Sequence, residues 1–169
     1  MIDQHYLEDA LAQYRRLKGQ ADKAIAQIGD EPLFATIDPD ANSIALIMKH
    51  VAGNMRSRWT DFLTSDGEKP DRQRDLEFET EQRDTRESVV AGWEAGWDLT
   101  LRTIASLTPE DLTKTVRIRG EGLTVVQAIN RQLSHYAEHV GQIVLLAKHY
   151  AGPAWQTLSL PKRRASASR

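Results

Sequence analysis

The strongest constraint on the fold is the spacing of apolar residues, which recur every three or four positions in four long stretches of the 169-residue chain. In the first stretch these are Tyr6, Ala10, Tyr14, Leu17, Ala21, Ala24, Ile25 and Ile28. Such spacing places apolar side chains on one face of an α-helix. The sequence therefore predicts an all-α fold, a four-helix bundle, with helices over residues 3–28, from Asn42 or Ser43 to about 65, 86–107 and from Thr124 to about 150.

The connections between these helices differ in length and character. The segment Ser65–Glu87 is charged, carries turn signals and is too long for a tight turn, so it is expected to be a surface excursion or a crossing connection. Thr108–Leu112 predicts a single helical turn, and the alternating Lys114–Gly122 predicts a strand or hairpin arm. Thr124 with Gln127 three residues later predicts a capping box that opens the last helix.

The composition is that of an ordinary globular protein, with 40% hydrophobic and 27% charged residues and a net charge of -2. We expect one domain over residues 1–160 and a basic flexible tail, Pro161–Arg169. Only this tail suggests nucleic-acid association, which the near-neutral charge makes unlikely. The chain has no cysteine, which excludes disulfides and thiolate ligands of its own. With no signal peptide or membrane-spanning stretch, a cytoplasmic protein without a membrane partner is expected.

Three histidines stand out as candidate metal ligands. His135 and His139 lie four positions apart, so their side chains leave the same helical face. His50 occupies the matching flank of the second predicted helix, so three imidazoles can meet at the rim of the bundle. Asn54 and Arg131, each one turn from a histidine, are candidates to orient a ligand or to contact an anionic substrate.

Neutral imidazole binds zinc, nickel, copper or iron, and three protein ligands leave a coordination position free for water or substrate. Partly buried histidines that hydrogen-bond to neighbours would account for the spacing equally well. His5 and His149 are expected at the surface, and Trp59, Trp93 and Trp97 in the core. Arg56, Arg58, Arg83 and Arg86 are expected on solvated faces. No motif names a catalytic acid, base or nucleophile.

The stretches HVAGNMRSRWTDFLTSDGEKP (residues 50–70) and INRQLSHYAEHVGQI (residues 129–143) resemble a branch, without assigned activity, of the DinB-like (YfiT-like) superfamily of metalloenzymes. The resemblance covers roughly residues 5–160. It implies an up-down-down-up four-helix bundle, often a homodimer. It also implies a divalent metal, with nickel, zinc and iron as candidates, held by His50, His135 and His139.

Characterised relatives in that superfamily include transferases and isomerases that use a low-molecular-weight thiol such as bacillithiol, mycothiol or glutathione. The resemblance therefore implies a thiol-dependent S-transferase or a metal-dependent hydrolase acting on a small molecule. The alternative is a non-catalytic, stress-related bundle that binds metal or a partner.

Overall fold

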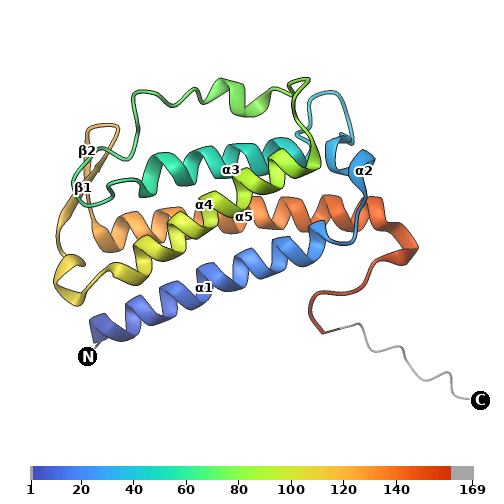
Figure 1. The fold of residues 1–169 in the computed structure, drawn as a ribbon. Coiled ribbons are helices and arrows are strands. Elements are labelled where there is room, and N and C mark those ends of the chain that lie inside the picture. Colours follow the sequence, from blue (N-terminus) through green and yellow to red (C-terminus); the bar gives the residue numbers. More distant parts are fainter. Residues whose placement is uncertain (1, 161–169) are drawn as a thin grey trace, which may run out of the picture.

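The structure, a computed structural model, describes residues 2–160 and is mostly helical. The predicted tail Pro161–Arg169 lies outside the described residues. Four long helices run through the described part of the chain, and each packs against two of the others, α1 and α3 both contacting α4 and α5. Figure 1 shows α1 and α5 running in one direction and α3 and α4 in the other. The long helices are α1 (Ile2–Ile25), α3 (Ile44–Trp59), α4 (Arg86–Ser106) and α5 (Val125–Ala151).

The ends of α3 show where the sequence prediction holds and where it is wrong. Ser43 caps the helix, as predicted, by accepting a hydrogen bond from the backbone N–H of Leu46 at 3.2 Å. The helix ends at Trp59 and not near Ser65. The Thr60 hydroxyl donates to the carbonyl of Arg56 at 2.7 Å, and Asp61 adopts a left-handed φ of 48°. These two residues turn the chain away from the helix axis.

Between α1 and α3 the chain forms a short helix that the sequence did not predict, α2 (Asp30–Phe34). It consists of little more than one turn, which is too short to show apolar periodicity. Its Leu33 is completely buried. The segment between the first two long helices therefore adds to the core.

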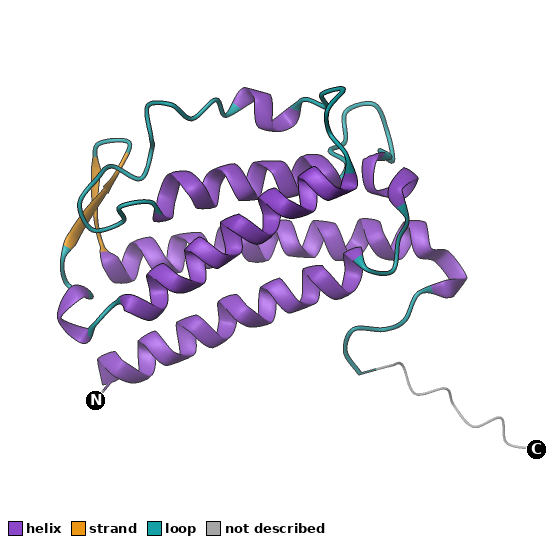
Figure 2. Ribbon diagram, viewed as in Figure 1, coloured by secondary structure: helices purple, strands orange, loops and turns teal. Residues whose placement is uncertain are grey.

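Residues 60–85, which we call the connecting segment, cross back along the length of α3 before α4 begins (Figure 2). The reason is geometric: α3 and α4 run in the same direction, so the chain must return over about 24 Å to start α4. The segment carries a short 3-10 turn, η1 (Asp75–Phe78), which packs on α3. Of the two predicted alternatives, the crossing connection is the one observed.

The region before α5 matches its prediction closely. The predicted single turn is η2 (Pro109–Asp111), and it is followed by the antiparallel hairpin of β1 (Thr115–Ile118) and β2 (Glu121–Thr124). Arg119 and Gly120, with φ of 56° and 78°, form its two-residue turn, in which both central residues are left-handed. The Thr124–Gln127 capping box then opens α5.

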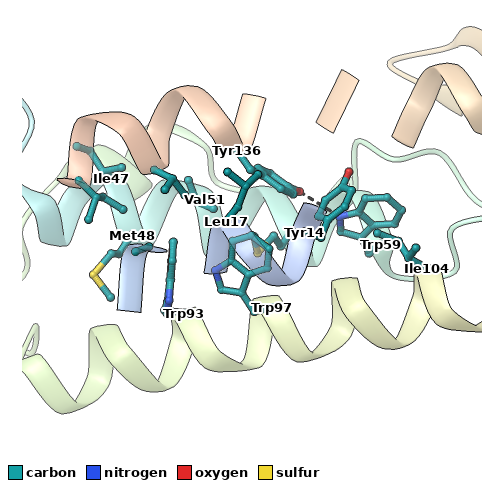
Figure 3. Close-up of a cluster of buried hydrophobic side chains, with 14 of the residues drawn as sticks. Tyr14, Leu17, Ile47, Met48, Val51, Trp59, Trp93, Trp97, Ile104 and Tyr136 are labelled. Carbon is teal, nitrogen blue, oxygen red and sulfur yellow. Dashed lines mark hydrogen bonds between the residues drawn. The ribbon is translucent and has the colours of Figure 1, made fainter. Parts of the chain in front are cut away.

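Aromatic side chains fill the core between the long helices (Figure 3). Trp59, Trp93 and Trp97 are almost completely buried, as predicted. Tyr14 meets the Trp59 ring edge-on, with centroids 5.9 Å apart, and its hydroxyl donates to the carbonyl of Ile129 at 2.8 Å. The Trp59 indole N–H donates to the Tyr136 hydroxyl at 3.1 Å. These contacts fix α3 against α5, the two helices that carry the candidate histidines.

No helix within residues 2–160 has both the length and the apolar character needed to cross a membrane.

Candidate metal centre

The structure brings His50, His135 and His139 together, as the sequence predicted. Their ligand nitrogens all lie within 4.8 Å of one another. The Nε2 atom of His135 is 3.4 Å from Nε2 of His50 and 3.0 Å from Nε2 of His139. Nitrogens about 2.0–2.1 Å from a zinc ion lie roughly 3.3 Å apart in a tetrahedral site. Both separations from His135 match this value, so the three imidazoles could hold a metal ion.

The other ring nitrogens of His50 and His139 are held by acceptors. Nδ1 of His50 lies 2.9 Å from Oε2 of Glu77, and Nδ1 of His139 lies 2.9 Å from Oε1 of Gln142. A carboxylate and an amide oxygen only accept hydrogen bonds, so each Nδ1 carries the proton. The lone pair of Nε2 then faces the shared centre in both rings. This is the arrangement in which histidine binds a metal through one nitrogen and a protein acceptor through the other.

The protonation state also suits metal binding. Burial, reinforced by the neighbouring imidazoles of His139 and His50, lowers the pKa of His135 to about 4. Burial lowers the pKa of His139 as well, although the hydrogen bond with Gln142 opposes the shift. Both rings are therefore neutral at neutral pH, which is the form that binds a metal.

Glu77, which lies in the connecting segment, is held by Arg72. The guanidinium donates from Nε to Oε1 and from Nη2 to Oε2 of the carboxylate, both at 2.8 Å. Burial alone would raise the pKa of Glu77, but the hydrogen bonds from Arg72 and His50 outweigh it and keep that pKa below its ordinary value. The carboxylate is thus ionised when it meets His50. Neither residue was predicted as part of the site, since nothing in the sequence of this charged segment distinguishes Arg72 and Glu77 from solvated side chains.

Two further contacts fix the connecting segment over His50. The Phe78 ring stacks on the imidazole with centroids 4.6 Å apart and an interplanar angle of 29°. Gly53, one turn after His50, leaves the space that the Glu77 carboxylate occupies, because a Cβ atom there would collide with Oε1. A side chain at this position in α3 would therefore displace the Glu77 carboxylate from the place where it meets His50.

A known protein family matches nearly the whole chain. Residues 1–164 match the family described as "Protein of unknown function (DUF1572)". The chain belongs to the DUF1572 family. No curated protein matches it. The histidine cluster thus lies in a DUF1572 protein within the part of the chain that the family match covers.

In this DUF1572 protein the other two predicted site residues, Asn54 and Arg131, lie beside the histidines. Both line a cavity of about 230 Å³ that also reaches His50 and His135. Asn54 is buried, and its Oδ1 accepts a hydrogen bond from the Tyr136 hydroxyl at 3.0 Å. Arg131 is half-exposed, with Nη1 3.7 Å from a carboxylate oxygen of Glu121.

The prediction for Arg58 is wrong, because this side chain is buried and not solvated. It is only 6% exposed, lines the same cavity and donates to the carbonyl of Gly67 and to Glu68. A signal was present in the sequence: Arg58 follows Asn54 by four residues and His50 by eight, which puts all three on one helical face. His5 and His149 are exposed, as predicted.

Proposed function

We propose that this DUF1572 protein is a divalent-metal-dependent enzyme in which His50, His135 and His139 are the ligands. The observation that carries the proposal is the convergence of these imidazoles within 4.8 Å, with Nδ1 of His50 and His139 engaged by protein acceptors. Three protein ligands leave a coordination position for water or substrate, which is typical of catalytic and not of structural metal sites. Imidazole ligands suit nickel, zinc and iron.

A divalent ion held by three imidazoles would act as a Lewis acid and lower the pKa of a bound water or thiol. The protein's own residues prepare the site for it. Glu77 keeps the proton of His50 on Nδ1, Arg72 keeps Glu77 ionised, and Phe78 fixes the plane of the His50 ring. The cavity that borders His50 and His135 gives a small substrate access to the same place.

Two reactions fit such a site: transfer to a low-molecular-weight thiol, and hydrolysis. The chain has no cysteine, so a thiol nucleophile would come from a cofactor such as bacillithiol, mycothiol or glutathione. A hydrolase would need water alone. Assays of electrophiles with and without added thiol separate the two, because only the transferase consumes the thiol.

The deciding experiment measures metal in protein purified without an affinity tag. Mass spectrometry should find close to one nickel, zinc or iron ion per chain, either as purified or after incubation with the metal. The His50→Ala variant should lose the ion and any activity together. A metal content near zero after incubation, or activity that survives this substitution, would overturn the proposal.

We further propose that the chain is a DinB-like protein, one domain over residues 1–160 with the up-down-down-up four-helix bundle of that superfamily. The direction of the four long helices and their shared core support this assignment. A homodimer is also proposed. The exposed side chains of Ile37 and Leu145 line one groove, and a second copy of the chain would cover them. A monomeric mass in light scattering at micromolar concentration would contradict the dimer.

A further inference from the structure

The cavity beside the three histidines is lined by hydrogen-bond donors to an unusual degree. Among residues 2–160, no aspartate or glutamate lines it, but five arginines do: Arg58, Arg72, Arg74, Arg119 and Arg131. They come from α3, the connecting segment, the hairpin turn and α5. We call this space the arginine cavity. A guanidinium cannot be deprotonated in proteins and offers five N–H donors, so the walls present positive charge and donors together.

Asn54 adds another donor, and a hydrogen-bond chain fixes its orientation. The Trp59 indole N–H can only donate, so the Tyr136 hydroxyl accepts from it and uses its own proton to donate to Oδ1 of Asn54. The Asn54 amide oxygen is thereby occupied. Its Nδ2 amino group is left for the cavity that Asn54 lines.

The protein's own carboxylates do not neutralise all of this charge. Glu68 accepts from Arg58 and Arg119 at 3.0 Å and from Arg72 at 3.4 Å, and Glu77 accepts from Arg72. Two carboxylates therefore serve three guanidiniums.

Among the described residues, the remaining two arginines have only distant carboxylate partners, although Arg74 also lies over the Phe78 ring, with Cζ 5.3 Å from its centroid. The side-chain nitrogens of Arg74 and Arg131 lie 4.0 Å from Asp75 and 3.7 Å from Glu121, and both of these carboxylates are exposed to solvent. Solvent-exposed pairs at such separations contribute little. The cavity thus has both spare positive charge and spare donors.

A buried amide in the wall also has unused hydrogen-bonding capacity. Gln132 lies one turn before Tyr136 on α5, lines the cavity and is 4% exposed. Its Oε1 has no hydrogen-bond partner among residues 2–160. Buried polar groups normally have a partner. An amide oxygen only accepts hydrogen bonds, so a water or a hydroxyl group of the ligand, and not the oxyanion itself, would complete Oε1.

We propose that the arginine cavity binds an oxyanion, a carboxylate or a phosphate group, of the substrate, so that the substrate class is a small anionic molecule. Arginine pairs with both groups through two parallel hydrogen bonds. The link to a reaction rests on the proposed function, because the cavity shares His50 and His135 with the metal centre. Binding of the anion itself does not require the metal.

The test uses calorimetric titration of the full-length protein with inorganic phosphate and with succinate, at constant ionic strength. Each probe is added to metal-free and to metal-loaded protein, and metal content is measured separately. We expect millimolar or tighter binding of at least one probe. Phosphate binding alone would indicate a phosphate ester, and succinate binding alone a carboxylic acid; either supports the proposal.

Variants locate the binding. Arg131→Gln, at a half-exposed position, should weaken binding roughly 10- to 100-fold, because a hydrogen bond to a charged group is lost. Arg119→Gln in the hairpin turn serves as a second variant, and Arg102→Gln on the exposed side of α4 as the matched control. Equal affinity for all four proteins, or no binding of either probe, would overturn the proposal.

The two proposals fail separately. Metal bound without either anion would contradict the anion site and leave the metal-dependent function standing. Arginine-dependent anion binding by a protein that never takes up metal would support the anion site and contradict the metal-dependent function.

Discussion

The carboxylate of Glu77 lies 2.9 Å from Nδ1 of His50. His50 lies in α3 and Glu77 in the connecting segment, so the chain folds back to bring the two residues together. Because α3 and α4 run in the same direction, the connecting segment has to recross α3 (Figures 1 and 2). Its contacts with His50 place it over the candidate metal centre. It delivers Arg72, Glu77 and Phe78 to that site. A topological requirement of the fold thus also completes the surroundings of His50.

Replacing Glu77 with glutamine should weaken metal binding about 10- to 100-fold, the usual cost of losing an acceptor behind a histidine ligand. The amide can still accept a hydrogen bond, but it has no charge to stabilise the His50 ring or to pair with Arg72. Competition against a chromogenic chelator measures the affinity. Glu79→Gln, an exposed position two residues away, is the control. Equal affinity for wild type and Glu77→Gln would refute a role for this carboxylate.

Gly53→Ala should lower metal affinity to a similar degree without removing any polar group of the site. The added methyl group would occupy the place of the Glu77 carboxylate and displace it from His50. Gly92→Ala on α4 is the matched control, since a Cβ there meets nothing within 4 Å. An alanine for glycine in a helix is by itself worth about 0.5–1 kcal/mol of stability.

Gly92→Ala should therefore raise the midpoint of thermal unfolding and leave metal affinity unchanged. If Gly53→Ala behaves like this control in both measurements, the close packing of Glu77 on α3 has no consequence for the site.

The histidine cluster was predictable from the sequence because helical periodicity decides which side chains share a face. His135 and His139 had to point the same way once α5 was recognised, and His50 had to flank the buried stripe of α3. Arg58 was predictable on the same grounds. Glu77 was not, because the connecting segment has no periodicity and its charged residues look alike until tertiary packing places one of them over His50. The early end of α3 likewise depends on the left-handed φ of Asp61, a conformation that the sequence permits but does not require.

Tyr136→Phe should lower the free energy of unfolding by about 1–3 kcal/mol, the cost of leaving buried polar groups unpaired. The Tyr136 hydroxyl accepts from Trp59 and donates to Asn54, and both partners are buried. Urea unfolding measures the change. Tyr150→Phe is the control: its hydroxyl is buried without a hydrogen-bond partner among the described residues, so removing it should leave stability unchanged or raise it. Equal effects of the two substitutions would contradict the hydrogen-bond chain.

Asp66→Asn should weaken the contact between the connecting segment and the hairpin, and its effect should depend on pH. Oδ1 of Asp66 accepts from the backbone N–H of Glu68 at 2.7 Å and of Arg119 at 2.9 Å, and Oδ2 accepts from Gly120 N–H at 2.8 Å. An asparagine keeps only one acceptor oxygen, so at least one of these bonds is lost. We expect a loss of about 0.5–1 kcal/mol at neutral pH, at the low end for a hydrogen bond because the site is partly exposed to solvent.

The same hydrogen bonds, first that from the backbone of Glu68, hold the pKa of Asp66 below its ordinary value of 3.8. A carboxyl group with a lowered pKa in the folded state contributes stability above its unfolded pKa and loses it as the pH falls through the folded value. The difference in unfolding free energy between wild type and Asp66→Asn should therefore be constant from pH 7 down to about pH 5 and shrink below about pH 4. Urea titrations across this range measure it, with Asp71→Asn, an exposed position in the same segment, as the control. A difference that stays constant into acid would mean that the charge of Asp66 does not hold the hairpin.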